Sequence, residues 1–144
     1  MSRKIGHTEA QYSKWIKEGR GSGEHQDYKP WLTVYDVPSD GRVHRVFGYK
    51  SKRTHHLLSD LELSMFYLLE WRSDVLQVKE QFPLERDITQ ELAESAGIKH
   101  PNVRGVAQYL SSDFLVETSS RDLPYFALQA KYVNSFEGLR KIEI

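Results

Sequence analysis

The sequence contains no cysteine and no long uninterrupted run of apolar residues. The absence of cysteine excludes a disulfide scaffold and thiolate zinc ligation, and it suits a reducing cytosol. A membrane-spanning helix needs about 18 consecutive apolar residues, and no stretch approaches that length. The opening residues MSRKIGHTEA also lack the apolar segment of a secretory signal. We therefore expect a soluble intracellular protein.

The chain also has no net charge, because it carries 20 lysines and arginines and 20 acidic residues. The charges are unevenly distributed. Residues 1–56 hold 11 basic against six acidic side chains, a surplus of five, and residues 57–144 hold nine against 14, a deficit of five. Binding to a phosphate backbone needs a local density of cations rather than a high overall charge. The pattern favours a metal site beside a DNA groove, and two ordinary solvated faces are the alternative.

A chain of 144 residues with 39% hydrophobic content fits one domain with a true core. Thr8 to Gln11 has the form of a helix start, and apolar residues then recur at helical spacing until Gly19. Two more segments are predicted to be helices, and the second of them is closed by Gly97. The expected helices are Thr8 to Gly19, Ser59 to Trp71 and Asp87 to Ala96.

Several segments have the alternation or β-branched content of strands. Pro38 to Gly41 is a turn signal that predicts a hairpin between the first two of them. Helices on a sheet built partly from hairpins indicate an α/β or α+β domain, with a mixed sheet flanked by helices. The final residues, Phe136 to Ile144, have helical spacing without a stop signal, so we expect the chain to end inside an element. The expected strands are Trp31 to Tyr35, Arg42 to Tyr49, Val75 to Phe82, Tyr109 to Glu117 and Tyr125 to Val133.

A carboxylate, Glu62, lies among the apolar residues of the expected helix from Ser59 to Trp71. At about 100° per residue, it falls between Leu69 and Phe66 in the apolar arc. Ser59 to Glu62 also has the form of a capping box, in which Glu62 would reach back to the Ser59 backbone amide. A cap stabilises a helix by about 1 kcal/mol, whereas an unpaired ion taken out of water costs several. Deep burial of Glu62 would therefore indicate a metal ion or a lysine as its partner.

The two late strands supply possible partners for Glu62. Alternation places Asp113 on the face away from Phe114, and it projects Gln129 and Lys131 together. An aspartate followed across a turn by an acid or amide, one spacer and a lysine is the pattern of the PD-(D/E)xK nucleases. By itself this pattern is weak, because such pairs on strands usually form surface or hydrogen-bonding contacts. The candidate oxygen ligands for Mg²⁺ are Glu62, Asp113, the Gln129 amide and the Ala130 carbonyl, with Lys131 to orient and help activate the attacking water.

Longer blocks of sequence point to a family. They are KEGRGSGEHQDYKPWLTVYDVPSDGRVHRVFGYK, THHLLSDLELSMFYLLEW, VKEQFPL, GIKHPNVRGV and SSDFLVE followed by FALQAKY. From about Ile16 to Lys131, the chain resembles the N-terminal catalytic domain of the TnsA family, the endonuclease subunits of heteromeric cut-and-paste transposases. Ordered blocks of this length are far more specific than the short catalytic pattern.

This resemblance implies a restriction-endonuclease-like fold and a bacterial cytoplasmic enzyme that cuts the 5′ strands at transposon ends. An integrase-type transposase would cut and join the 3′ ends. The expected reaction is phosphodiester hydrolysis with one or two Mg²⁺ ions, for which Mn²⁺ could substitute. Carried over by position, the family's catalytic site falls on Glu62, Asp113 and Lys131, with Gln129 where many nucleases outside the family hold an acid.

A basic stretch leads into the Glu62 helix and is a candidate phosphate-binding flank. An exposed hairpin with ordinary charges is the alternative. A histidine zinc site is disfavoured, because the adjacent His55 and His56 would point in opposite directions on a strand. The glycine-rich residues 19–23 lack the features of a nucleotide loop, and no serine-hydrolase elbow is present. The candidate DNA-binding residues are Arg42, Arg45, Lys50, Lys52, Arg53, His55 and His56.

The resemblance also implies that the chain is shorter than the family proteins. We expect residues 1–144 to form one endonuclease domain without the family's winged-helix-like C-terminal domain. That missing domain would contact an ATP-dependent regulator. A catalytically incompetent module for DNA binding or assembly of a transposition complex is therefore the alternative function.

Overall fold

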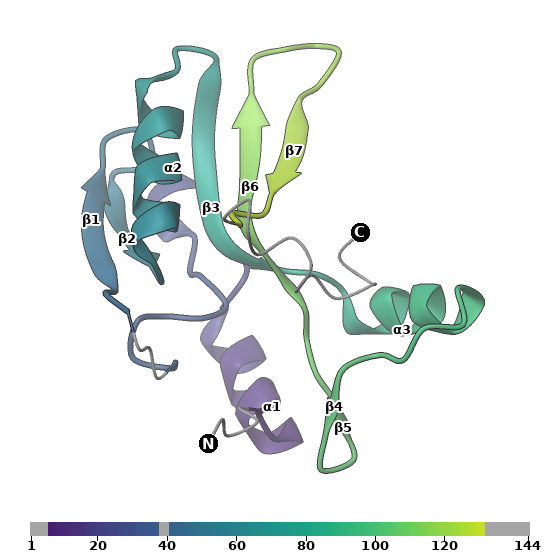
Figure 1. Cartoon of the computed structure of the whole chain (residues 1–144). Helices are drawn as coiled ribbons and strands as arrows, with labels where there is room; N and C mark the ends of the chain where they lie inside the picture. The colour runs from purple at the N-terminus through teal and green to yellow at the C-terminus, as the bar shows by residue number, and fades with distance from the viewer. Residues whose placement is uncertain (1–5, 38–40, 132–144) are drawn as a thin grey trace.

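The computed structural model describes residues 6–37 and 41–131, and these residues form an α/β domain (Figure 1). No helix among them is long and apolar enough to cross a membrane. The helices are α1 (Glu9–Glu18), the short 3₁₀ helix η1 (His25–Asp27), α2 (Asp60–Trp71) and α3 (Arg86–Ser95). The strands are β1 (His44–Gly48), β2 (Arg53–Leu57), β3 (Val75–Pro83), β4 (Asn102–Val103), β5 (Val106–Ala107), β6 (Ser111–Thr118) and β7 (Tyr125–Leu128).

Strand β6 lies at the centre of a three-stranded sheet of order β3-β6-β7. Two further hairpins, β1-β2 and β4-β5, form separate two-stranded sheets. Every strand pairing within the described residues is antiparallel. The α/β prediction, with helices beside a sheet, is confirmed, and the architecture is consistent with a restriction-endonuclease-like fold.

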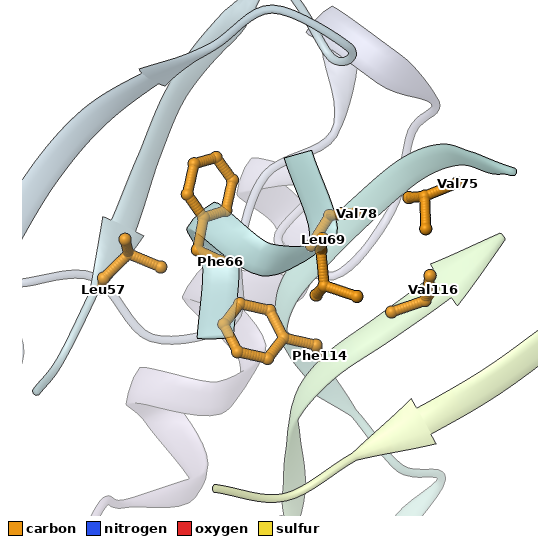
Figure 2. Close-up of a cluster of buried hydrophobic side chains, with 7 residues drawn as sticks. All are labelled: Leu57, Phe66, Leu69, Val75, Val78, Phe114 and Val116. Carbon is orange, nitrogen blue, oxygen red and sulfur yellow. The ribbon is translucent and has the colours of Figure 1, made fainter. Parts of the chain in front are cut away.

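Helix α2 lies between the β1-β2 hairpin and strand β3 (Figure 1). Its buried apolar residues, Phe66 and Leu69, pack against the inward-facing side chains of β3 and β6. Figure 2 shows these side chains meeting between the helix and the two strands. Burying such a side chain stabilises the fold by about 1.5 to 3 kcal/mol. The cluster consists of Leu57, Phe66, Leu69, Val75, Val78, Phe114 and Val116.

Helix α1 begins and ends as the sequence predicts. The Thr8 and Gln11 side chains form a reciprocal capping box, and Gly19 ends the helix in the left-handed conformation. Its buried face contributes Tyr12 and Trp15 to a second apolar cluster, which Trp31 completes. This cluster connects the N-terminal segment to the rest of the domain.

The predicted hairpin between Trp31 to Tyr35 and the following strand is wrong. Residues 31–35 are a loop, because the Asp36 carboxylate accepts hydrogen bonds from the amide and hydroxyl of Thr33 and holds a local turn. Strand β1 pairs with β2 instead, a strand that the sequence did not indicate. Between them, Lys52 has a φ of 54° and its amide donates to the Gly48 carbonyl.

The remaining predicted elements match their counterparts apart from their ends. Helices α2 and α3 and strands β3 and β6 lie within two residues of the predicted bounds. Strand β7 ends at Leu128, so the predicted extension is wrong over residues 129–131, which are described and are not strand. The Asp113 carboxylate, rather than a strand partner, accepts the hydrogen bond of the Ala130 amide. The rest of that extension, residues 132–133, and the predicted element Phe136 to Ile144 lie outside the described residues. The short β4-β5 hairpin was not predicted; its turn contains Arg104 and Gly105, both with positive φ.

Candidate functional site

Glu62 is buried in the first turn of α2, with 7% of its surface exposed. Its carboxylate accepts hydrogen bonds from the Ser59 hydroxyl at 2.9 Å and from the Gln81 side-chain amide at 3.0 Å. The expected return bond to the Ser59 backbone amide is replaced by the bond to the Ser59 hydroxyl. Capping therefore does not explain why an acid lies here.

The charge of Glu62 has no cationic partner among the residues that the structure describes, because both of its hydrogen-bond donors are neutral. The pKa of Glu62 is raised from 4.5 to about 7. Burial is the main cause, and the negative charge of Asp113 contributes to the same rise. The influence of Asp113 shows that the two carboxylates lie close enough to repel each other. A pair of acids in this arrangement favours a bound cation.

Asp113 projects from β6, and its carboxylate accepts a hydrogen bond of 2.7 Å from the Ala130 backbone amide. This bond ties the chain beyond β7 to the β6 strand. In the register of the two strands, Leu115 lies opposite Ala127. Continuing that register by two residues places Asp113 opposite Gln129. The structure thus brings together Glu62, Asp113 and the backbone of Ala130.

Gln129 and Lys131 are both exposed, and Lys131 is the last of the described residues before position 132. Neither side chain forms a hydrogen bond or ion pair within the described part of the chain. Their predicted convergence on the two carboxylates stays a prediction.

Gln81 is a member of this group that the sequence did not identify. It is 4% exposed, and its amide oxygen accepts a hydrogen bond of 3.2 Å from the Ser111 hydroxyl while its amide nitrogen donates to Glu62. The Val75 to Phe82 segment looks like an ordinary strand, and only its uninterrupted run of polar residues, KEQ, hinted at a special role.

The donor chemistry of the site fits a hard divalent cation. Mg²⁺ prefers oxygen ligands, and the carboxylates of Glu62 and Asp113 and the Ala130 carbonyl are oxygen donors. Among residues 6–37 and 41–131, no cluster of three or more histidine and acidic side chains could hold a metal ion. A site here would therefore combine two carboxylates with neutral amide or carbonyl oxygens, as the candidate set does.

Two of the predicted DNA contacts, Arg53 and His55, lie against a buried acid. His55 is fully buried, and its Nδ1 lies 3.0 Å from a carboxylate oxygen of Glu80. Arg53 forms a bidentate ion pair with the same carboxylate, and its side chain is 8% exposed. The bonds to Glu80 account for both side chains without DNA, so these two are the weakest of the predicted contacts and stay predictions. Hydrogen bonding to a fully buried acid outweighs its burial, so the pKa of Glu80 falls to about 2.

The other basic residues remain predictions, with different degrees of exposure. Arg45 and Lys52 are exposed, while Lys50 donates to the Arg72 carbonyl. Arg42 is exposed and pairs with Asp60. His56 is half-buried, and burial lowers its pKa, which disfavours a charged imidazolium at neutral pH. The exposed cations Arg42, Arg45 and Lys52 are the strongest of the predicted DNA contacts.

Because the pKa of Glu62 is raised in the folded protein, we expect the stability of the protein to depend on pH. Between pH 4.5 and about 7 the unfolded chain releases this proton and the folded chain retains it, so the free energy of unfolding falls as pH rises. The full penalty, on the order of 3 kcal/mol, is present above about pH 7. We expect Glu62→Gln to stabilise the metal-free protein at about pH 8 and to have little effect at about pH 4. Thermal unfolding at both pH values measures this, and an equal effect at both would contradict it.

Comparisons with known proteins concern the chain as a whole. The chain matches no protein-family model. It is 50% identical over 136 residues to the transposon Tn7 transposition protein TnsA of Escherichia coli, and the aligned region covers 94% of this chain and 50% of that protein. The chain thus spans about half the length of this curated relative. The predicted resemblance to TnsA is confirmed.

Proposed function

We propose, from the premise that this chain is TnsA-like, that it is a metal-dependent DNA endonuclease subunit of a heteromeric transposase. It would act in the bacterial cytoplasm and hydrolyse phosphodiester bonds at the 5′ strands of transposon ends. The observation that carries the proposal is the buried Glu62 carboxylate, held by neutral donors alone and close enough to Asp113 to feel its charge. Such a pair has the charge and the oxygen chemistry to hold divalent cations beside a phosphate.

The residues of the site would have three roles: binding the cation, orienting the water and contacting the DNA. Glu62 and Asp113 would supply the charged ligands, and the Gln129 amide and Ala130 carbonyl would supply neutral ones. When bound, Mg²⁺ or Mn²⁺ provides the positive charge that stabilises the scissile phosphate and the leaving 3′ oxygen. Lys131 would orient the attacking water and help to activate it. The exposed cations of the β1-β2 region would contact the DNA backbone.

Because Gln129 replaces an acid, the site would have one negative charge fewer than many related nucleases. Its cation affinity would then depend more strongly on the phosphate of bound DNA. The partners that follow from this proposal are double-stranded transposon ends and an integrase-type transposase. An ATP-dependent regulator would contact sequence beyond the aligned half of the relative.

The test is strand nicking in the presence of Mg²⁺ or Mn²⁺, transposon-end DNA and the matching transposase. We expect nicks on the 5′ strands that require the cation, and no nicking with EDTA. DNA binding without cation-dependent nicking would reject the enzyme and support a module for DNA binding or assembly instead. Performing the assay with the transposase present is essential, because the subunit would work within the assembly.

We expect Lys131→Ala to abolish nicking while the protein still folds and binds the cation. The lysine is exposed and makes no contact that holds the described part of the chain together, so its removal leaves the fold intact. Nicking, calorimetric titration with Mn²⁺ and thermal unfolding measure the three properties. Lys99→Ala changes another exposed lysine, one outside the candidate site and the predicted DNA contacts, so it is the matched control and should retain nicking. Full nicking by Lys131→Ala would remove this lysine from the mechanism.

A further inference from the structure

Gln81 connects two elements of the candidate site through its side-chain amide. The nitrogen donates to Glu62 on α2, and the oxygen accepts from Ser111 at the start of β6. A glutamine amide has one end that only donates and one that only accepts. The hydroxyl of Ser111 therefore fixes which end of the amide faces Glu62.

The backbone of Gln81 is held in an unusual conformation. Its φ is 46°, in the left-handed region that costs a non-glycine residue about 1 to 2 kcal/mol. The Gln81 carbonyl accepts hydrogen bonds from the Trp31 amide and the Tyr28 hydroxyl, which hold the strand in this shape. The β3-β6 register continues on both sides, at Glu80 and Phe82. The strained residue is thus a local departure from a regular ladder, and strain of this kind is concentrated at functional sites.

We propose that Gln81 is a positioning residue that holds the Glu62 carboxylate in the orientation in which it would bind a divalent cation. The inference rests on the proposed function and extends it to a residue that contacts no substrate. Of the two Glu62 oxygens, Oε1 accepts from Gln81 and Oε2 accepts from Ser59. Both oxygens are therefore oriented by the protein. Ser59 is the N-cap of α2 itself, whereas Gln81 reaches Glu62 from β3.

An alternative role, packing alone, makes a different prediction. Gln81 would then be replaceable by any side chain of similar volume without loss of cation affinity. Groups that orient metal ligands behave otherwise, because their removal weakens metal affinity or activity about 10- to 100-fold. A measurement of cation affinity therefore distinguishes packing from positioning, whereas a measurement of stability does not.

The experiment uses Gln81→Met, which keeps the volume and removes the amide, and Gln81→Gly, which removes the amide and relieves the positive φ. The control is Gln77→Met on the same strand. Gln77 is also buried, and its amide bonds Glu24 and Glu117, outside the candidate site. Each protein is titrated with Mn²⁺ in the presence of transposon-end DNA, its thermal unfolding is recorded, and nicking is measured against Mn²⁺ concentration with the transposase present.

We expect both Gln81 variants to bind Mn²⁺ at least about tenfold more weakly than wild type and to need correspondingly more Mn²⁺ for half-maximal nicking. Gln77→Met should lose stability but keep wild-type affinity. Wild-type affinity in either folded Gln81 variant would overturn the inference, and so would failure of both variants to fold, which would make Gln81 a structural residue. If the wild-type protein neither binds Mn²⁺ nor nicks, the proposed function fails. If the wild-type protein does both and the Gln81 variants match it, this inference fails and the proposed function stands.

Discussion

Replacing Asp113 with alanine is expected to lower strand nicking more than about a hundredfold, beyond the range usual for groups that only orient metal ligands. The substitution removes one of the two carboxylates of the site and, with it, the negative charge next to Glu62. It also removes the acceptor for the Ala130 amide, so the segment after β7 would lose its tie to β6. Nicking with saturating Mn²⁺ and the transposase present is the measurement.

Asp113→Asn separates the two effects. An asparagine side chain can still accept a hydrogen bond from the Ala130 amide, but it carries no charge. If the charge is what matters, Asp113→Asn should lose nicking and cation affinity as Asp113→Ala does, with thermal stability closer to wild type. Nicking by Asp113→Asn at the wild-type rate would show that Asp113 acts through the Ala130 contact and not as a charged ligand.

The sequence predicted the elements whose patterns are local. Apolar spacing placed Glu62 on the buried face of α2, and the structure confirms this burial. Alternation placed Asp113 on the opposite face from the buried Phe114, and β6 shows that alternation throughout its length. Helix and strand periods are properties of neighbouring residues, so they can be read without knowing the fold.

What the sequence could not predict depends on contacts between distant residues. Residues 31–35 have β-forming side chains, but the turn at Asp36 prevents a strand. Arg53 and His55 look like part of a basic surface until the position of Glu80, 25 or more residues later, becomes known. Gln81 has no local signal for a bond to Glu62, 19 residues earlier. In each case the deciding partner comes from another element.

Glu80→Ala is expected to destabilise the protein by about 3 to 5 kcal/mol, because it leaves the Arg53 guanidinium buried without its counter-charge. For a chain of this size, the loss corresponds to a fall of roughly 10 to 20 °C in Tm. The pKa of Glu80 lies at about 2, below its ordinary value of 4.5. Its stabilising contribution is therefore complete above about pH 4.5 and is lost as the pH falls towards 2. Thermal unfolding of both proteins at about pH 7 and pH 3 should show the difference shrinking with acidity.

A double-mutant cycle identifies the partner. Arg53→Ala and Glu80→Ala should together destabilise the protein less than the sum of the single effects, by at least about 1 kcal/mol, because the second substitution removes a group already left unpaired. The same variants test whether Arg53 contacts DNA or serves Glu80. An arginine that binds a phosphate contributes to the salt dependence of DNA affinity, whereas one bound to Glu80 does not. Arg53→Ala should leave the salt dependence of DNA affinity unchanged, and Arg45→Ala should reduce it. The contrary result would be additive losses of stability in the double mutant together with a reduced salt dependence for Arg53→Ala. That result would show that Arg53 contacts DNA.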